Sequence, residues 1–517
     1  MMLISFIVIL MAGGLAAWIA ARWNETASRW IALLAVTIDL VWSVVFWIQH
    51  SPFPDVMSAT WIIRYQQPWI SRFGIGISVA MDGLSLLLLV LTFFLGVLSV
   101  LTSWNEIRYR VGFFHFNLMW VLAGIAGVFV VMDLFLFYFF WEVMLIPMYF
   151  LIGIWGHENR RYAAVKFFIF TQASGLMMLL AILGLYFIHA NQSGAYTFDY
   201  FSLLGTDLPA SSGRWLMFGF LAAFVVKLPA VPFHSWLPDA HSQAPTAGSL
   251  ILAGLLLKTG AYGMLRFALP LFPQAAHEIA FAAMVLGVVG ILYGAMLAYG
   301  QTDLKRLVAY TSVSHMGFVI LGIFAFNELA LQGVVMQLIA HGLSTGALFI
   351  IAGSLYERIH TRDLNLMGGF WARMPFMGTI TLVFVLASLG LPGLANFIAE
   401  FLTLVGSWQA NNVLTILAAS GLVLAMAYSL RIMQKVFLGE MKDENVILPD
   451  LSLREKLMLV PMAVLIIGLG LFPQSLLRTS KNTVIHILDQ VRVKDVADTV
   501  EDLIEMTGLK GGEGERQ

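Results

Sequence analysis

Four ionisable residues lie inside long hydrophobic runs of the chain. Glu142 follows FYFFW, Lys227 follows FLAAFVV, Lys258 follows LILAGLLL and Glu400 follows LPGLANFIA. A charged side chain at the centre of a bilayer costs about 2.5–3.5 kcal/mol on insertion scales, so such groups usually face a polar interior. Buried amines and carboxylates of this kind mark ion or proton paths. We therefore expect these four residues to carry the chemistry.

Composition assigns the chain to the membrane proteins. Of its 517 residues, 60% are hydrophobic and 11% are charged, whereas soluble domains carry about 25% charged residues. The chain has no cysteine, which excludes disulfides, iron–sulfur clusters and thiolate metal sites. A net charge of −1 gives no reason to expect nucleic acid. We predict an all-α polytopic membrane protein without a cofactor of its own.

About fourteen segments are long and apolar enough to span a membrane, which takes roughly 20 residues. They are 2–21, 29–48, 78–103, 113–132, 134–155, 163–189, 214–235, 244–268, 277–299, 304–324, 330–354, 375–404, 413–437 and 456–474. Residues 51–77 are rich in aromatic residues and proline, and we expect an excursion along the membrane interface. In the tail, 479–517, apolar residues alternate with charged ones, which predicts an amphipathic helix followed by a disordered end.

Basic loop residues predict the orientation, because cytoplasmic loops carry an excess of Lys and Arg. Loops after even-numbered spans hold mainly Arg64, Arg72 and Arg214. Loops after odd-numbered spans hold many more, namely Arg22, Arg29, Arg108, Arg110, Arg160, Arg161, Lys305, Arg306, Arg358, Arg362, Arg373, Lys442, Arg454 and Lys456. We therefore place the odd-side loops in the cytoplasm and both termini outside.

Two spans carry a Leu-Pro pair near their middle, in VKLPAVPFHSW (226–236) and LGLPGLANFIA (389–399). Proline inside a helix breaks or kinks it, and broken helices at matching positions of two halves indicate a transporter site. An odd number of spans separates the two pairs, which makes the repeats inverted. The predicted regions are 1–112 (helices 1–3 and the interfacial segment), 113–268 (first repeat, helices 4–8), 277–437 (second repeat, helices 9–13) and 438–517 (last span and tail).

Lys227 and Glu142 are predicted to work as a pair. Lys227 lies at the break of the seventh span, and because burial penalises its charged form, it can release a proton readily. Glu142, in the fifth span, is its natural partner, and their separation would decide which member is charged. Two alternatives stay open: a lysine that snorkels to the interface, and a static salt bridge that only fixes packing.

Lys258 and Glu400 are predicted to continue the series. Lys258 is followed by Thr259 and Gly260, which loosen the helix, and we expect it to be the middle relay. The alternative is a structural partner for a carboxylate. Glu400 lies eight residues after Pro392, and we expect it to be the terminal proton-exchange group of the second repeat.

Histidines add candidate proton relays. His234 lies seven residues after Lys227, on nearly the same face if the helix resumes, and His241 follows in the PDAHSQAPT loop. His315 and His341 lie within the tenth and eleventh spans. The alternative is a hydrogen-bonded core histidine, but several at one depth beside Lys and Glu favour a relay. No pair has the spacing of a metal site such as HExxH, so metal binding is not expected.

The remaining ionisable residues near spans are interpreted mainly as helix-end or interface pairs. They are Asp39, Asp82, Asp133, Lys166 and Arg266. A further group, Asp303, Lys305 and Arg306, predicts a cap on the tenth span.

Four segments of the chain resemble one family. They are WEVMLIPMYFLIGIWG, VKLPAVPFHSWLPDAHSQAPTAGSLILAGLLLKTGAYG, QTDLKRLVAYTSVSHMGF and YERIHTRDLNLMGG. They are similar to the antiporter-like membrane subunits of respiratory complex I, the NADH:quinone oxidoreductase. The resemblance covers nearly the whole chain, is weakest at its two ends, and is most specific in HSWLPDAHSQAPTAGS.

The resemblance implies a role for each buried residue. Glu142 matches the glutamate of the family's fifth helix, and Lys227 matches the lysine of its broken seventh helix. Lys258 matches the central lysine on the eighth helix, and Glu400 the terminal ionisable residue of the broken twelfth helix. Sister subunits and related cation/proton antiporters typically carry lysine at that last position, so the glutamate points to one particular subunit. The family's connecting polar axis would run through His234, His315 and His341.

The function implied by the resemblance is proton translocation in a bacterial respiratory complex I of the inner membrane. Other subunits would transfer electrons from NADH to quinone and would hold flavin mononucleotide, iron–sulfur clusters and the quinone. The implied partners are other membrane subunits, especially two sister antiporter-like subunits on either side, together with lipid and protons. Two alternatives stay open: a subunit of a multisubunit Na⁺/H⁺ antiporter, and a structural spacer whose buried charges are static.

Overall fold

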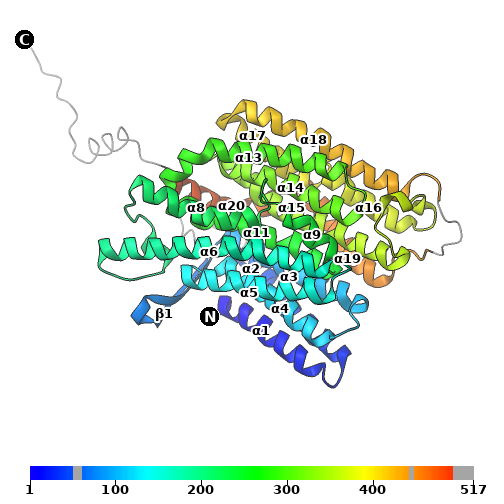
Figure 1. The fold of residues 1–517 in the computed structure, drawn as a ribbon, viewed down its shortest axis with the longest axis horizontal. Coiled ribbons are helices and arrows are strands. Elements are labelled where there is room, and N and C mark those ends of the chain that lie inside the picture. The colour runs from blue at the N-terminus through cyan, green and yellow to red at the C-terminus, as the bar shows by residue number, and fades with distance from the viewer. Residues whose placement is uncertain (51–60, 442–447, 493–517) are drawn as a thin grey trace, which may run out of the picture.

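Helices make up most of the chain that the structure describes (Figure 1). The structure is a computed structural model and describes residues 1–50, 61–441 and 448–492. Within these residues, 11 helices are long and apolar enough to cross a membrane, or up to 12 if one bent pair counts as a single span. The predicted all-α, multi-span class is confirmed. The count of about fourteen spans is not, in part because the predicted span 375–404 divides into two shorter helices.

The long helices follow the predicted hydrophobic runs closely. They are α1 (Met2–Ala20), α2 (Glu25–His50), α3 (Gly83–Glu106), α4 (Val111–Val130), α5 (Leu134–Trp155), α6 (Arg160–Ser193), α8 (Ala210–Lys227), α13 (Pro273–Tyr299), α14 (Leu304–Ile323), α15 (Glu328–Ile359), α16 (Pro375–Ser388), α17 (Ala395–Ala410), α18 (Asn412–Ile432), α19 (Leu453–Leu471) and α20 (Gln474–Val491). Two short helices, α7 (Tyr200–Leu203) and α9 (Trp236–Gln243), lie on either side of α8 in the sequence.

The predicted span 244–268 is a composite helix. Its α-helical parts are α10 (Thr246–Ile251), α11 (Leu257–Gly263) and α12 (Leu269–Leu271). Two π-helical turns, η2 (Leu252–Leu256) and η3 (Met264–Ala268), join them. Since π-helical turns are rare and frequently lie at functional sites, this helix is the first structural pointer to a site.

Side-chain caps define where several spans begin. Asp82, Asp133 and Asp303 each accept a backbone hydrogen bond from the first turn of α3, α5 and α14, respectively. Such caps satisfy N–H groups that have no partner inside the helix. The helix-end predictions for these three residues are confirmed. Lys305 is different, because it is buried and donates to the Ala244 carbonyl at 3.1 Å instead of capping the tenth span.

A β-hairpin precedes α3, and its strands were not predicted. Strand β1 (Ile63–Ile70) pairs antiparallel with β2 (Ile75–Met81), and Gly74 turns the chain at φ +67. Alternating β-branched and polar residues favour strands here. As a result α3 begins at Gly83, not at 78. The rest of the predicted interfacial segment, 51–60, lies outside the described residues.

The two helical breaks are confirmed at the predicted Leu-Pro pairs. Helix α8 ends at Lys227 and α9 begins at Trp236, whose Nε1 donates to the Val226 carbonyl at 3.0 Å. Helix α16 ends at Ser388 and α17 begins at Ala395. The inverted repeat and the four region boundaries stay predictions.

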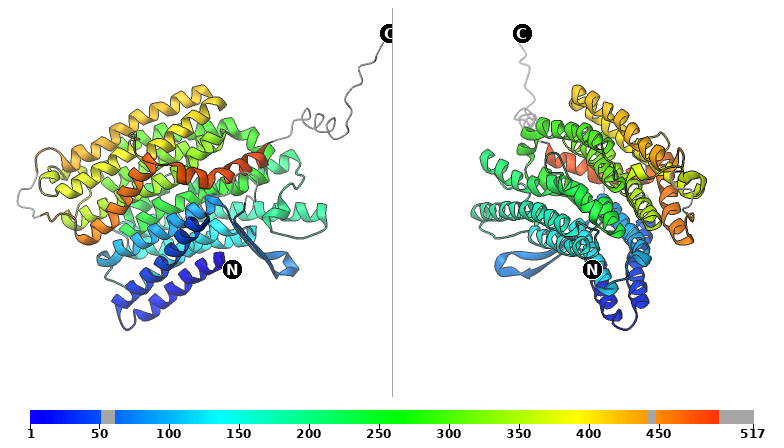
Figure 2. Two further views of the ribbon diagram at one scale, coloured as in Figure 1. Left: turned by 180° about the vertical axis from the view of Figure 1, so that it is seen from behind. Right: turned by 45° about the vertical axis from the view of Figure 1, so that its right-hand side comes forward.

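The interior of the bundle is formed by helices from the middle of the sequence. Helices α1 and α2 form one edge and α18 the opposite edge, with α11, α14 and α15 between them (Figures 1 and 2). The composite helix and the hydrophobic part of α15 are completely buried within the chain, and α14 nearly so. Charged side chains in membrane proteins face such interiors. These helices are therefore the ones to search for the site.

The last helices close one side of the bundle. Helix α20 turns by 70° away from α19, and its apolar residues Leu476, Val484 and Ile487 are buried. The amphipathic helix predicted in the tail is thus confirmed, although it starts earlier, at Gln474. The predicted disordered end, 493–517, lies outside the described residues.

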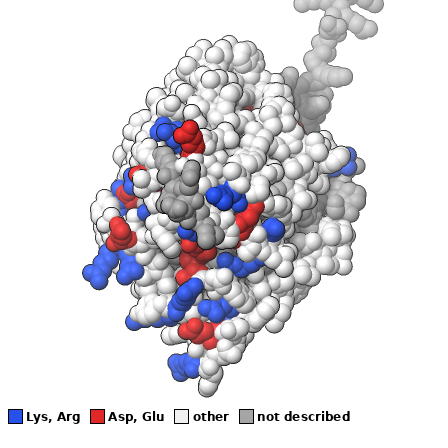
Figure 3. All heavy atoms as spheres, turned by 90° about the vertical axis from the view of Figure 1, so that its right-hand side faces the viewer, with Lys and Arg blue, Asp and Glu red and all other residues white. Residues whose placement is uncertain are grey.

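Lysine, arginine, aspartate and glutamate side chains gather on one end of the molecule (Figure 3). At this end α3 ends at Glu106 and α4 begins at Val111, and the hairpin lies at the opposite end (Figure 1). We call these the charged end and the hairpin end. The loop between α3 and α4, which was predicted to be cytoplasmic, belongs to the charged end.

Helices α13 and α14 approach each other closely at glycines. A Cβ on Gly317 would lie 2.6 Å from the Gly287 carbonyl oxygen and 2.7 Å from the Ile291 backbone nitrogen. Because both neighbours are backbone atoms, we expect Gly317→Ala to push the helices apart and cost about 1–3 kcal/mol of stability. Thermal unfolding of the detergent-solubilised protein measures this loss. Gly468→Ala is the matched control, since nothing lies within 4 Å of its Cβ position, and equal losses in both variants would contradict the packing explanation.

Candidate functional site

Lys258 lies at the centre of the site. It is on α11, between the two π-helical turns, and is fully buried. Its Nζ lies 2.7 Å from Nδ1 of His341 and donates to the Ala253 carbonyl at 2.5 Å. Ala253 belongs to the first π-helical turn, where the regular α-helical bonding is interrupted. An amine that contacts an imidazole directly can exchange a proton with it.

The polar series continues from His341 to Glu400 through His315. The rings of His341, on α15, and His315, on α14, have centroids 5.6 Å apart. Nδ1 of His315 lies 2.9 Å from Oε1 of Glu400, on α17. The structure therefore brings together four of the predicted residues from four helices. We call Lys258, His341, His315 and Glu400 the central series.

Glu400 is held by the break between α16 and α17. Its side chain is 2% exposed, and its Oε2 has no hydrogen-bond partner among the described residues. A Cβ on Gly390, which has φ +78, would lie 2.9 Å from that oxygen. Glycine permits both this backbone conformation and this close approach. The broken helix thus covers the carboxylate with backbone.

Two further groups contact His315 and were not predicted. Its Nε2 lies 3.3 Å from Oγ of Ser388 and 3.4 Å from the hydroxyl of Tyr428. Ser388 is the last residue of α16 before the break, so its position beside the Leu-Pro pair could have suggested it. Tyr428, on α18, carries no such signal, because only the fold brings it to His315.

Lys227 and Glu142 form a separate pair of buried groups. Lys227 is 1% exposed, and its Nζ has no hydrogen-bond partner among the described residues. It lies 5.1 Å from the ring centroid of Trp141 and 5.7 Å from that of Phe167. Such contacts attract a cation to the faces of the rings.

Lys227 and Glu142, which were predicted to work as a pair, are not bonded to each other. They do not approach to within the 4.0 Å that defines the ion pairs of the described residues. Glu142 is half-buried, and its Oε1 would lie 3.1 Å from a Cβ on Gly175 of α6. Lys227 instead contacts Trp141, the residue before Glu142. The two charges are therefore close neighbours in the fold but are not bonded.

His234 and His241 differ from their predicted places. His234 lies in the turn between α8 and α9, because the helix does not resume until Trp236, and it packs against Tyr293 and Tyr310. It does not share a helical face with Lys227. His241 lies within α9, not in a loop, and stacks on Phe349 with centroids 4.5 Å apart. Neither ring contacts the central series by a described hydrogen bond.

Of the other residues predicted to form helix-end or interface pairs, two have a partner in the part of the chain that the structure describes and one does not. Lys166 bonds Asp239 at 2.7 Å, and Arg266 bonds Asp82 with both side chains fully buried. Asp39 is an exception, because it lies in the middle of α2, is fully buried, and neither carboxylate oxygen has a hydrogen-bond partner among the described residues. Its interpretation as a helix-end or interface pair is wrong.

The fold and the central series define an antiporter-like, multi-span membrane protein. Residues 131–425 match the family described as "NADH:quinone oxidoreductase/Mrp antiporter, TM". NADH-quinone oxidoreductase subunit M of Pseudomonas aeruginosa is 55% identical over 478 residues, which cover 90% of this chain and 94% of that protein. This chain belongs to the family of NADH-quinone oxidoreductase subunit M. Its glutamate at position 400 pointed to one subunit among several, and that prediction is confirmed.

Two solved structures resemble the fold. Respiratory complex I from Thermus thermophilus with bound NADH contains a chain with a TM-score of 0.86 and 28% identity, and the match covers 95% of this chain and 100% of that one. The Mrp complex from Dietzia sp. contains a chain with a TM-score of 0.79 at 19% identity, covering 94% and 97%. At that identity the second likeness concerns the fold alone.

Proposed function

We propose that this chain translocates protons as a membrane subunit of respiratory complex I, driven by electron transfer from NADH to quinone in other subunits. The observation that carries the proposal is the central series. Lys258, His341, His315 and Glu400 come from four helices and lie in series in a buried interior, with hydrogen-bond distances at both ends and a ring contact between the two histidines. Buried ionisable groups that lie in series inside a membrane bundle are typical of proton relays.

Each member of the central series has a distinct task in this proposal. Lys258 holds a proton as an ammonium or releases it to His341. The imidazoles of His341 and His315 accept a proton on one nitrogen and donate from the other. Glu400 takes the proton as a neutral carboxylic acid and gives it up as a carboxylate. One proton moves along the series: at each step the donor loses one unit of positive charge and the acceptor gains it.

Lys227 and Glu142 would control whether Lys258 keeps its proton. Because charges interact strongly at low dielectric, a charged Lys227 disfavours a second ammonium nearby. When Glu142 approaches Lys227, the pair becomes electrostatically neutral as a unit and that repulsion falls. Electron transfer in partner subunits would act by changing this separation.

The electron carriers would belong to partner subunits. The chain has no cysteine, the residue that holds iron–sulfur clusters in proteins. We therefore assign flavin mononucleotide, the iron–sulfur clusters and the quinone to other subunits. Those subunits are the partners of this chain, and we place the two sister antiporter-like subunits on its two sides, with lipid around them.

The setting of the chain is a bacterial inner membrane. We place the charged end of the bundle in the cytoplasm, because its loops carry most of the basic residues. The hairpin end, and with it the N-terminus, would then face the other side. We also propose that the segments 113–268 and 277–437 form the two inverted repeats, since each contains one of the broken helices.

The two other candidate functions are less well supported. A subunit of a multisubunit Na⁺/H⁺ antiporter shares the fold, but the likeness to the Mrp complex lies at 19% identity, whereas subunit M of P. aeruginosa is 55% identical. A structural spacer would have static, fully paired charges. The unpartnered atoms Lys227 Nζ and Glu400 Oε2 argue for groups that change partners.

Lys227→Ala in the intact complex tests the proposal. We expect NADH-driven proton translocation in inverted membrane vesicles to fall by up to about tenfold. This loss is smaller than for a residue that transfers the proton itself, because Lys227 acts through Lys258. Lys481→Ala is the control, since Lys481 is exposed on α20. The same preparation should contain flavin and iron–sulfur subunits. A normally assembled Lys227→Ala complex with full proton translocation would refute the controlling role of this residue.

A further inference from the structure

The helix that carries Lys258 continues with two more polar residues on the same face. Tyr262 and Arg266 follow at intervals of four residues, which places the three side chains one above the other. All three are fully buried. Arg266 lies roughly 12 Å beyond Lys258 along the helix axis, inside the second π-helical turn. The row leads away from the central series, toward the hairpin end.

Arg266, the last residue of this row, forms a buried ion pair with Asp82. Asp82 caps α3 directly after strand β2, and both side chains of the pair are 0% exposed. Removing two charges from water is costly, so a buried pair is weak grounds for stability alone. Nε and Nη1 of Arg266 have no hydrogen-bond partner among the described residues, and its guanidinium lies 4.6 Å from the ring of Trp61. The guanidinium therefore keeps a stabilising contact if it leaves Asp82.

Two hydroxyl groups connect the lysine helix to the start of α3, which Asp82 caps. The hydroxyl of Tyr262 lies 3.2 Å from Oγ of Ser85 and donates to the Phe129 carbonyl at 2.9 Å. The backbone N–H of Ser85 donates to Asp82 at 2.9 Å. A hydroxyl can accept one proton while it donates another. Tyr262, one turn after Lys258, and Ser85, three residues after Asp82, thus place two bonded hydroxyls in the region between Lys258 and Asp82.

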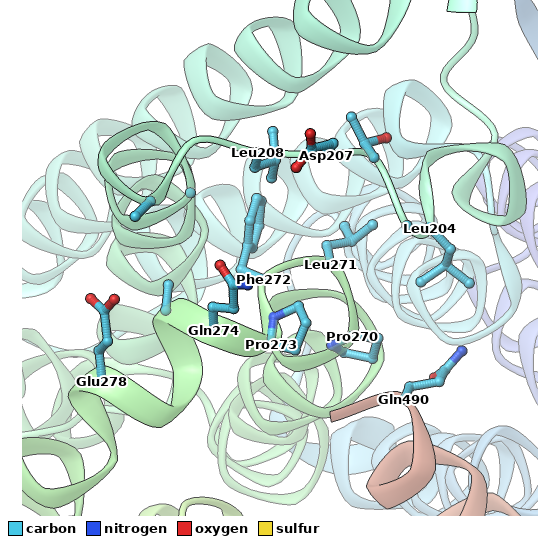
Figure 4. Close-up of a pocket in the computed structure, with 15 residues that line it drawn as sticks. Leu204, Asp207, Leu208, Pro270, Leu271, Phe272, Pro273, Gln274, Glu278 and Gln490 are labelled. Atoms are coloured by element: carbon cyan, nitrogen blue, oxygen red, sulfur yellow. The ribbon is translucent and has the colours of Figure 1, made fainter. Parts of the chain in front are cut away.

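The ion pair lies near a cavity at the hairpin end. This cavity of about 430 Å³ is lined by residues of the loop before α8, of the α12–α13 junction and of α20 (Figure 4). Pro270, one helical turn after Arg266, and Gln490 are among them. Oε1 of Gln490 accepts a hydrogen bond at 3.4 Å from the buried hydroxyl of Tyr200. Exposed Asp207 and Glu278 also line the cavity, which therefore reaches solvent.

We propose that Tyr262, Ser85, Asp82 and Arg266 form a second proton route from Lys258 to the hairpin end, with the Asp82–Arg266 pair as its gate. This route rests on the proposed function, because Lys258 supplies the proton. The Lys258 ammonium becomes an amine, the two hydroxyls pass the proton on, and the Asp82 carboxylate becomes a carboxylic acid. Arg266 then loses its counter-ion and keeps its contact with the Trp61 ring. Loss of the proton to the cavity restores the pair.

Two variants of the intact complex test the route. Asp82→Asn keeps the shape and the cap acceptor but cannot take a proton, and we expect proton translocation per assembled complex to fall by roughly a tenth, because most protons leave Lys258 through the central series. Tyr262→Phe removes one hydroxyl and leaves the ion pair in place. We expect it to lower proton translocation as well and to increase the ratio of rates in H₂O and D₂O, which a merely structural role would not change.

Tyr186→Phe is the matched control. The Tyr186 hydroxyl also donates to a backbone carbonyl, that of Phe73, at 3.1 Å at the hairpin end, but it lies outside the route. Its rate and isotope ratio should equal those of the unmodified complex. If Asp82→Asn fails to assemble, Tyr262→Phe decides, because it preserves the ring and the pair. Wild-type proton translocation and isotope ratio in Tyr262→Phe would overturn the route.

The outcome also separates this route from the proposed function. If Lys258→Ala stops proton translocation while Asp82→Asn and Tyr262→Phe behave like the unmodified complex, the route is wrong and the proposed function stands. If all three variants translocate protons normally, the proposed function itself is wrong.

Discussion

Replacing Lys258 with alanine should lower NADH-driven proton translocation on the order of 10²-fold, the size of effect typical for loss of a proton-transfer group. Lys258 contacts His341 directly and also starts the row that leads to Arg266. Both proton routes therefore depend on this one amine. Proton uptake into inverted membrane vesicles, followed with a pH-sensitive dye and divided by the amount of assembled complex, measures the loss.

Lys258→Arg sharpens this prediction. An arginine keeps a positive charge at the centre of the bundle, but its guanidinium stays protonated in proteins. If Lys258 serves by releasing its proton, the arginine variant should be nearly as inactive as the alanine variant. If Lys258 only supplies a static positive charge, as in a spacer subunit, arginine should restore function. Full activity in the arginine variant would therefore support the spacer and contradict the relay.

Much of the fold follows from the sequence because hydropathy is a local property. Runs of apolar residues give the helices, and the Leu-Pro pairs give the two breaks at Lys227 and Ser388. The four ionisable residues inside those runs were visible for the same reason, since a charge in lipid needs a special explanation. The hairpin was missed because its short strands alternate polar and apolar residues and resemble an interfacial loop.

Partnerships between distant residues could not be predicted in the same way. Arg266 pairs with Asp82 across 184 positions, and His315 meets Tyr428 across 113. Helical spacing orders residues along one helix but does not say which helices pack together. The separation of Lys227 from Glu142 was open for that reason, and the packing of α5 places the Trp141 ring beside the lysine. Asp39 is a different case, because it lies near the middle of both the predicted span 29–48 and α2, so its position already argued against a helix-end role.

Glu400→Gln is the second variant with a large expected effect. Glutamine keeps the length of the side chain and an oxygen that can accept a hydrogen bond from Nδ1 of His315, which lies 2.9 Å from Oε1 of Glu400. It cannot gain or lose a proton at physiological pH. We expect proton translocation to fall by roughly 10- to 100-fold, with normal assembly, because the shape of the site beside Gly390 is unchanged. Glu25→Gln is the control, since Glu25 is exposed at the start of α2.

Comparing Glu400→Gln with Lys258→Ala then shows how protons divide between the two routes. If the central series carries the whole flow, the two variants should be equally impaired. If part of the flow leaves Lys258 through Tyr262 and Asp82, Glu400→Gln should retain a residual rate, and adding Tyr262→Phe should remove it. A residual rate that Tyr262→Phe does not change would mean that His315 passes its proton elsewhere, and the hydroxyl of Tyr428, 3.4 Å from its Nε2, would be the next group to test.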